Sequence, residues 1–288
     1  MSPKELFTVP IAPCDPHPGG SIVATQPYPA VYLLTFSSPS DNRLTTPFCA
    51  AMLRALDLIE FGDYGPPGVV VTTSAIPKFY SNGLDLDHAQ DNAPGYWTGA
   101  LYPLFRRFLA YPMPTVALVN GHAFAGGAML AMHHDYRVMN PAKGFLCLNE
   151  LDFGAPLKAP MAGVFRLKVA DPAVYRRVVL EAHRFPGPQA LEAGLVDALG
   201  GLDDGVMAQL VGPRGLVAKG RTGVYGFLKM QMYREQLGYL TAAGFDADEA
   251  RDAALLALED ERIDKGKEAV ARWKAEAAAG GEAPKAKL

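Results

Sequence analysis

The chain contains 288 residues, of which 49% are hydrophobic and 20% are charged, an ordinary composition for a globular protein. Its formal net charge of −3 argues against a nucleic-acid-binding protein, which would carry a basic surface. The three cysteines (Cys14, Cys49 and Cys147) cannot all pair and fit no metal-binding spacing, which favours a reducing compartment over secretion. We expect no membrane span and no signal peptide, because neither pattern occurs in the sequence.

Residues 1–28 are rich in proline and glycine and are expected to be irregular. After them, hydrophobic patterns predict strands that alternate with helices. In chain order these are a strand at 30–36, a helix at 46–61, a strand at 68–73, a helix at 95–111, a strand at 115–119, and short strands at 136–139 and 144–148. Pro103 is expected to kink the helix at 95–111.

After Pro160 the pattern becomes mostly helical, and strand signals nearly disappear beyond residue 200. The expected helices lie at 173–182, 188–193, 246–261 and 265–279, and Gly194 is expected to end the second of them. The predicted fold class is therefore α/β, with residues 1–200 as the core and residues 201–288 as a C-terminal helical region.

The most informative segment runs from Val119 to Met129 and reads VNGHAFAGGAM. A buried strand here leads into a glycine-rich turn that opens a helix. Glycines let backbone amides approach a ligand, and a helix N-terminus favours negative charge. The glycine spacing matches neither the G-x-G-x-x-G dinucleotide motif nor a P-loop. The turn is therefore suited to holding an anionic oxygen with backbone amides.

A similar turn, KFYSNGLDL, lies at residues 78–86 after the strand at 68–73. Two such turns can direct two N–H donors at one oxygen and so form an oxyanion hole. Taken alone, each turn is equally well explained as a tight connection between a strand and a helix.

Glu150 lies in a third segment, LNELDFGAP, at residues 148–156, with apolar residues on both sides. Apolar surroundings disfavour the charged form of a carboxyl group, so its pKa is expected to rise toward that of a useful base. A solvated loop glutamate is the alternative interpretation. If Glu150 is not the base, Asp152, two residues further on, is the alternative candidate.

Together these segments resemble the crotonase (enoyl-CoA hydratase/isomerase) superfamily, and most of all its monofunctional peroxisomal Δ3,Δ2-enoyl-CoA isomerases. The motifs that carry the resemblance occur in order at residues 79–86, 120–127, 135–138 (DYRV), 148–154 and 190–197 (ALEAGLVD). Each motif alone is weak, but their order and spacing are specific over roughly residues 28–200. The resemblance implies a spiral core of ββα units, with C-terminal helices that pack between subunits into homotrimers or hexamers.

The resemblance also implies roles for individual residues. Leu84 and Gly126 supply the oxyanion-hole amides, and Glu150 is the catalytic acid/base. Hydratases of this family carry a second acid/base glutamate where this chain has Met129. Because water addition needs two such groups and double-bond migration needs one base, the resemblance implies an isomerase. Its substrate is a fatty acyl-CoA of β-oxidation, whose double bond moves from C3 to C2.

Further residues that the resemblance places along the substrate come from the same turns: Lys78, Tyr80, Ser81, Asn82, Gly83, Leu86, Phe124, Gly127 and Met129. Lys78 is expected either to meet a CoA phosphate or to be an ordinary solvated lysine. Coenzyme A is part of the substrate, so no separate cofactor is expected. A metal is not expected either, because the adjacent His133 and His134 point in different directions on a helix.

Two other functions stay open at this stage. One is a different acyl-CoA reaction on the same fold, such as hydration, dienoyl-CoA isomerisation or thioester hydrolysis. The other is a non-catalytic acyl-CoA-binding member, against which Glu150 argues because a pure binder needs no carboxylate there.

The last residues, Ala286-Lys287-Leu288, are close to the Ser-Lys-Leu peroxisomal signal. They predict recognition by the peroxisomal import receptor, with a cytoplasmic location as the alternative. A lysine- and alanine-rich helix end would look the same.

Overall fold

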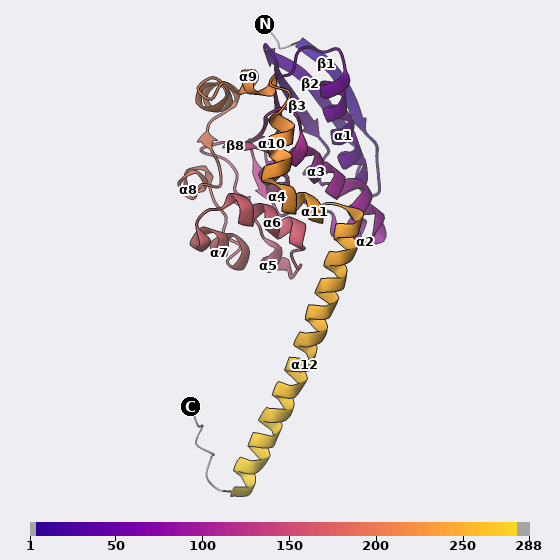
Figure 1. The fold of residues 1–288 in the computed structure, drawn as a ribbon, viewed down its shortest axis with the longest axis vertical. Coiled ribbons are helices and arrows are strands. Elements are labelled where there is room, and N and C mark those ends of the chain that lie inside the picture. The colour runs from indigo at the N-terminus through magenta and orange to yellow at the C-terminus, as the bar shows by residue number, and fades with distance from the viewer. Residues whose placement is uncertain (1–3, 281–288) are drawn as a thin grey trace. The chain divides into compact units, whose positions relative to one another are not determined.

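The computed structural model describes residues 4–280 (Figure 1). Residues up to 242 form one compact unit, and the described part of a second unit is the long helix α12 (Ala242–Gly280). Residues 201–242, expected to belong to a separate C-terminal region, are part of the compact unit. Within residues 4–280, none of the helices combines the length and the apolar character that crossing a bilayer requires.

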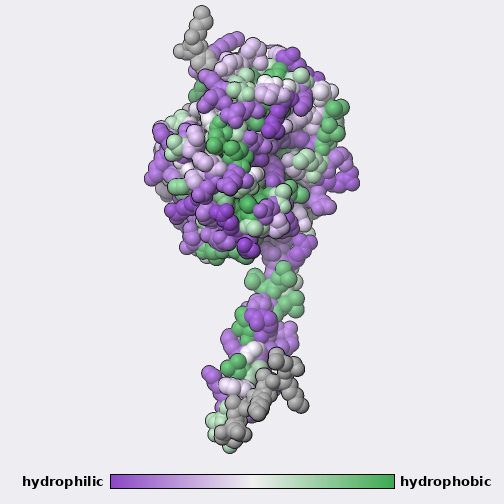
Figure 2. All heavy atoms as spheres, turned by 90° about the vertical axis from the view of Figure 1, so that its left-hand side faces the viewer, coloured by the Kyte–Doolittle hydropathy of each residue, from purple (hydrophilic) through white to green (hydrophobic). Residues whose placement is uncertain are grey.

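Helix α12 corrects the prediction of two helices at 246–261 and 265–279. The helix continues through residues 262–264, where two separate helices were expected, because Arg262, Ile263 and Asp264 include no glycine or proline that would end it. An ion pair between Lys265 and Glu261, four residues apart, spans this segment and supports the helix. Apolar side chains such as Leu256 and Trp273 are exposed along α12, where Figure 2 shows green spheres among purple ones.

The main sheet of the compact unit has seven strands in the order β1-β2-β3-β4-β6-β8-β10. Their bounds are β1 (Lys4–Ile11), β2 (Gly20–Tyr28), β3 (Val31–Ser37), β4 (Val69–Ser74), β6 (Thr115–Val119), β8 (Tyr136–Met139) and β10 (Ala198–Leu199). The first three strands pair antiparallel, and the neighbours from β3 onward pair parallel. The four strands expected at 30–36, 68–73, 115–119 and 136–139 are thus present as β3, β4, β6 and β8.

Strands β1 and β2 show that the expectation of an irregular segment at 1–28 is wrong. They form a hairpin that buries Val9 and Ile11 from one strand and Ile22 and Ala24 from the other, with Val9 directly opposite Ile22. Pro10 is tolerated because β1 lies at the edge of the sheet, where a missing backbone donor disrupts no ladder. The prolines in this segment therefore led to the wrong prediction of irregular structure. The hairpin packs against helix α1 (Thr46–Phe61).

A second sheet brings the three sequence motifs together. Its strands, β5 (Phe79–Ser81), β7 (His122–Phe124) and β9 (Leu146–Cys147), pair parallel in the order β5-β7-β9. The last of them is shorter than the strand expected at 144–148. Because parallel strands end at the same edge of a sheet, the segments that follow β5, β7 and β9 lie side by side. This small sheet therefore positions the site.

The helices surround these two sheets (Figure 1). Besides α1 they are α2 (Leu86–Asp91), the π-helical turn η1 (Trp97–Leu101), α3 (Tyr102–Ala110), α4 (Gly126–His133), α5 (Glu150–Phe153), α6 (Ala159–Lys168), α7 (Pro172–Leu180), α8 (Gly187–Glu192), the π-helical η2 (Leu202–Val211), α9 (Leu216–Gly220), α10 (Tyr225–Met232) and α11 (Arg234–Tyr239). The helix predicted at 46–61 has those bounds, and α7 and α8 match the helices predicted at 173–182 and 188–193. Gly194 follows α8 with a φ of +68°, as expected of a glycine that ends a helix.

Pro103 lies in the first turn of α3, directly after the π-helical turn. The backbone stays helical from residue 95 to residue 110 across this turn, so the helix expected at 95–111 is present, and its irregularity is the π-helical turn before Pro103.

Every residue of α4 is buried, and its first three residues, Gly126, Gly127 and Ala128, are small. A Cβ atom at Gly127 would lie 2.2 Å from the carbonyl oxygen of Ser81. At the other end, the ring of His133 stacks on Phe105, and His134 Nε2 lies 2.9 Å from the Thr72 hydroxyl. These two histidines are therefore part of the packing. Within residues 4–280, no group of three His, Cys, Asp or Glu side chains is arranged to hold a metal.

The motifs at 135–138 and 190–197 support the fold. The backbone amide of Arg137 donates to Asp197 Oδ2 at 2.8 Å, and its Nε donates to the carbonyl of Leu195 at 2.7 Å. Arg137 and Asp197 also form an ion pair at 3.0 Å. The second motif is thereby tied to β8, away from the edge where the glycine turns meet.

Candidate active site

A cavity of about 630 Å³ opens where the segments after β5, β7 and β9 meet. The first segment contributes Leu84 and Leu86, the second contributes Ala125, and the third contributes Asn149 and Glu150. Three distant stretches of sequence therefore form one wall each of a common site.

The first turn depends on Gly83, whose φ of +84° is unfavourable for other residues. A Cβ atom there would also lie 2.8 Å from both Gly126 N and the carbonyl oxygen of Phe124. The carbonyl of Gly83 accepts a hydrogen bond from Leu44 N at 2.9 Å. Since N–H and C=O point in opposite directions in a trans peptide, the amide of Leu84 points away from Leu44.

The second turn places a strained residue before α4. Ala125 has φ of +48° and ψ of −121°, a conformation that a non-glycine residue adopts only when its surroundings enforce it. Gly126 begins α4, so its amide belongs to the first N–H groups of a helix, which have no partner within the helix. A Cβ atom at Gly126 would lie 3.2 Å from Leu84 N. The two predicted oxyanion residues are therefore neighbours.

Glu150 is 8% exposed and begins the short helix α5. Its Oε2 atom is buried and has no hydrogen-bond partner among the described residues. Burial raises the pKa of Glu150 to about 7, although a backbone hydrogen bond partly opposes the shift. The buried setting expected from its apolar neighbours is thus confirmed. A carboxyl group with this pKa can accept and return a proton at neutral pH.

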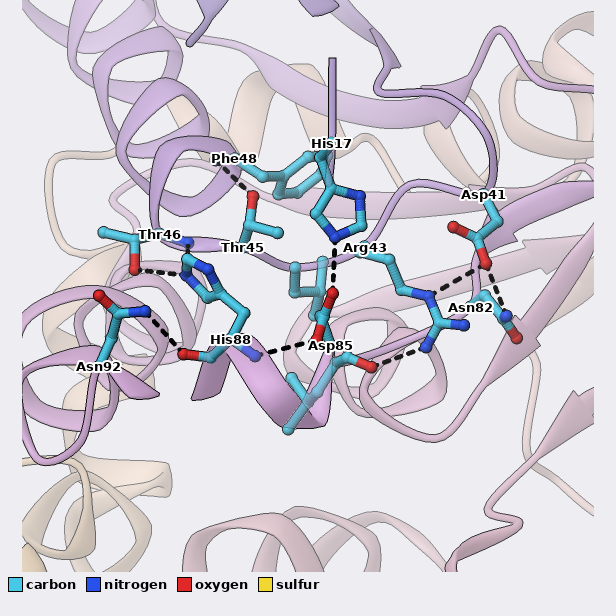
Figure 3. A network of polar contacts seen from close by, with 12 residues as sticks. His17, Asp41, Arg43, Thr45, Thr46, Phe48, Asn82, Asp85, His88 and Asn92 are labelled. Carbon is cyan, nitrogen blue, oxygen red and sulfur yellow. Dashed lines mark hydrogen bonds and ion pairs between the residues drawn. The ribbon is translucent and has the colours of Figure 1, made fainter. Parts of the chain in front are cut away.

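A polar network borders the first turn (Figure 3). Asp85 accepts a hydrogen bond from His88 N at 3.0 Å and so caps α2, as its position before the helix predicts. On its other oxygen, Asp85 contacts His17 Nε2 at 2.7 Å. His88 in turn lies 2.9 Å from the Thr46 hydroxyl, which joins α2 to the start of α1.

Several predicted substrate-binding residues lie behind the cavity wall. Tyr80 is fully buried with its hydroxyl 2.9 Å from Thr72 Oγ1, and the Ser81 hydroxyl donates to the carbonyl of Asn42. The side chain of Met129 is buried within α4. These side chains, together with Gly83 and Gly127, shape the turns without lining the cavity.

Two further residues of the predicted set lie outside the lining. Lys78 is exposed, with its ammonium 5.1 Å from the centre of the Phe79 ring. Phe124 is half-buried beside Arg184. Asn82, Leu84 and Leu86 do line the cavity, as predicted.

Asp152 is the alternative candidate for the base, and its side chain is 50% exposed. Its Oδ2 atom lies 4.0 Å from Arg184 Nη2. It is absent from the lining of the cavity. Burial therefore distinguishes Glu150 from its acidic neighbour.

Sequence reasoning missed other lining residues, among them Arg43, Trp97 and Met161. Arg43 follows β3, and the loops at the carboxyl ends of parallel strands are where sites in such sheets form. Its position after a predicted parallel strand could therefore have identified Arg43 as a candidate site residue. Trp97 and Met161 come from helices, and nothing local in the sequence indicates which of their faces meets the cavity.

Comparison with known proteins gives a consistent result. Residues 27–250 match the family model described as enoyl-CoA hydratase/isomerase. The chain is 33% identical over 211 residues to enoyl-CoA delta isomerase 1, peroxisomal, of Arabidopsis thaliana, covering 72% of this chain and 88% of that protein. It is 30% identical to a carnitinyl-CoA dehydratase of Salmonella arizonae, over 57% of this chain and 62% of that protein.

Among solved structures, the human mitochondrial delta3-delta2-enoyl-CoA isomerase matches with a TM-score of 0.68 and 23% identity. The match covers 88% of this chain and 98% of the human one. The likeness confirms the expected crotonase-like fold.

Burial of Glu150 gives a stability that depends on pH. Its ordinary pKa of 4.5 rises to about 7 on folding, so the folded state prefers the neutral form. Below pH 4.5 the carboxyl group is neutral in both the folded and the unfolded state, so it does not affect stability. As the pH rises from 4.5 to about 7, ionisation favours the unfolded state and lowers the free energy of unfolding. Glu150→Gln should therefore raise the free energy of unfolding at pH 8 by roughly 3 kcal/mol and leave it unchanged at pH 4. Urea denaturation at both pH values measures this.

The exposed neighbour provides the control, because Asp152→Asn should give no such pH-dependent gain. An equal gain from Glu150→Gln at pH 4 and pH 8 would show that the burial argument is wrong.

Proposed function

This chain belongs to the enoyl-CoA hydratase/isomerase family, and from that premise we propose that it is a Δ3,Δ2-enoyl-CoA isomerase of fatty-acid β-oxidation. The observation that carries the proposal is the composition of the cavity. Of the described residues that line it, only Glu150 has a carboxyl group. Migration of a double bond needs one base, whereas addition of water needs two acid/base groups.

In the proposed reaction, ionised Glu150 removes a proton from C2 of a 3-enoyl-CoA. The electron pair of that C–H bond spreads over C2, C3, C4 and the thioester oxygen as a dienolate. Glu150 then returns the proton to C4, which gives the 2-enoyl-CoA and restores the carboxylate. No water is consumed.

The two turns suit the charge that develops on the thioester oxygen. The amides of Leu84 and Gly126 are fixed before the substrate binds, so little reorganisation is needed when the charge appears. Preorganised donors of this kind contribute about 3–4 kcal/mol each to lowering a barrier.

Met129 supports the choice of isomerisation over hydration. Its side chain is 1% exposed within α4 and provides no acid/base group. A water molecule in the cavity would therefore meet one carboxyl group, which cannot both activate it and protonate the neighbouring carbon.

Several accompanying properties are proposals as well. The reaction moves only a proton, so we propose no cofactor apart from the coenzyme A of the substrate. Exposed apolar side chains on α10 (Phe227, Leu228) and α12 (Leu256, Val270) support self-association as a trimer or hexamer.

A peroxisomal location is proposed from the names of the plant relatives. The tripeptide Ala286-Lys287-Leu288 lies outside the described residues, so its recognition by the import receptor stays a prediction.

Glu150→Gln should lower kcat for a 3-enoyl-CoA by at least about 10²- to 10⁴-fold, because the amide cannot accept the proton. In the wild-type protein, kcat/KM should rise as the pH passes through about 7, since the active form of Glu150 is ionised. Steady-state kinetics between pH 5 and 9 checks both. Asp152→Asn is the matched control and should keep wild-type turnover. If Asp152→Asn is inactive while Glu150→Gln is active, the base is misassigned.

Wild-type protein should move the double bond of a 3-enoyl-CoA far faster than it adds water to a 2-enoyl-CoA, because Met129 replaces a second acid/base group. Both reactions can be followed in parallel by chromatographic separation of the CoA esters. Hydration at a rate comparable with isomerisation would contradict the one-base proposal and favour a hydratase.

A further inference from the structure

The loop between β3 and α1 holds the first glycine turn from behind, and we propose that Arg43 in this loop is a positioning residue for the oxyanion hole. It fixes the backbone on either side of Leu84 without taking part in proton transfer. The inference deepens the proposed function and rests on it for the identity of the reaction.

Both carbonyl groups beside the Leu84 amide are held by this loop. Leu44 N donates to the carbonyl of Gly83 at 2.9 Å, which sets the plane of the peptide that carries the Leu84 N–H. Arg43 Nη1 donates to the carbonyl of Leu84 at 2.7 Å, which sets the plane of the next peptide (Figure 3). With both planes set, the N–H of Leu84 has one direction, away from Leu44, and the amide nitrogen lies close to Gly126.

Arg43 is itself held in place by a carboxylate. Its Nε donates to Asp41 Oδ2 at 3.0 Å, and the same oxygen accepts from Asn82 Nδ2 at 2.7 Å (Figure 3). The backbone is joined too, because Asn82 N donates to the carbonyl of Asp41 at 2.9 Å. The loop is therefore hydrogen-bonded to three successive residues of the turn, Asn82, Gly83 and Leu84.

The fork of the guanidinium matters for this arrangement. Its planar donors serve a carboxylate on one side and a backbone carbonyl on the other. A lysine carries the same charge on one nitrogen and cannot reproduce both contacts with the same geometry. The position therefore requires arginine for its shape as well as for its charge.

The first turn needs such support because it has little of its own. Strand β5 ends at Ser81 and α2 begins at Leu86, so the residues between them lie outside regular structure. Gly83 has no Cβ atom to restrict its backbone. A displacement of about 1 Å at a site that positions reacting groups can cost about 10²-fold in rate.

Arg43 also lines the cavity with a side chain that is 30% exposed. The competing explanation is that it binds an anionic part of the substrate directly. The two roles differ in measurable ways. A positioning residue changes kcat and the polarisation of the substrate carbonyl, whereas a binding residue changes KM, and lysine can substitute for it.

The test compares Arg43→Met and Arg43→Lys with the wild-type protein, using a saturated acyl-CoA that cannot isomerise. Isotope-edited infrared spectroscopy measures the thioester C=O stretch, which moves to lower frequency when the oxygen accepts hydrogen bonds. We expect both variants to lose much of that shift. With a 3-enoyl-CoA, kcat should fall about 10- to 100-fold, while KM stays within about threefold. This loss of rate does not exceed the loss expected when one hydrogen-bond donor is removed from an oxyanion hole.

Arg54→Met is the matched control, since Arg54 is an exposed arginine on α1. It should leave the C=O frequency and both kinetic constants unchanged. Asp41→Asn is the second variant and addresses the case in which Arg43→Met fails to fold. It removes the carboxylate that orients Arg43, so it should reduce the frequency shift and kcat in the same direction but by less.

Two results would overturn the inference. The first is that folded Arg43→Met keeps the C=O frequency and the kcat of the wild-type protein. If Arg43→Met does not fold, the same result in Asp41→Asn overturns the inference. The other is a raised KM that Arg43→Lys restores, which would make Arg43 a binding residue. Failure of the proposed function is recognised separately, as a wild-type protein that shifts the C=O frequency but does not isomerise the 3-enoyl-CoA.

Discussion

The close approach of two backbone turns constrains most of this structure. A Cβ atom at Gly83 would lie 2.8 Å from the nitrogen of Gly126, so the two turns can meet only where no side chain intervenes. The contact needs β5 and β7 side by side, and a helix behind them that begins with small residues, which is α4. It also holds Ala125 in a conformation with φ of +48°. The strain at Ala125 and the loss of side chains at the glycines are offset by the burial of α4.

The same packing gives Glu150 its chemistry. Leu148 and Cys147 precede it in a buried strand end, so its carboxyl group has little solvent around it. Burial destabilises the ionised form and at the same time makes that form a stronger base. The cost to folding and the proton affinity needed for the reaction therefore have one physical origin. This is a stability–activity trade-off located in a single side chain.

The sequence predicted the parts of the site that depend on local patterns. Glycines after buried strands marked both turns, and apolar neighbours marked Glu150. Predictions based on single side chains were less accurate. Tyr80 and Met129 lie in the right segments, but strand and helix geometry turns their side chains into the core. That direction depends on how β5 and α4 pack, which a segment read alone does not contain.

Arg43 shows the complementary limit. It is far from Leu84 in sequence, and its role follows from hydrogen bonds between a loop and a turn that only the folded chain brings together. The hairpin of β1 and β2 was missed because prolines in an edge strand have the same local signature as an irregular segment. The prediction divided the continuous helix α12 between residues 261 and 265, although the residues in that gap include no glycine or proline that would end a helix.

If the two turns and Glu150 form one site around a thioester, a bound acyl-CoA must contact all three of them. The most direct measurement is a crystal structure of the protein with a bound saturated acyl-CoA. We expect the thioester oxygen within about 2.7–3.1 Å of both Leu84 N and Gly126 N, with the Glu150 carboxylate facing C2 and C4. A thioester bound elsewhere, with Glu150 out of reach of those carbons, would contradict this expectation.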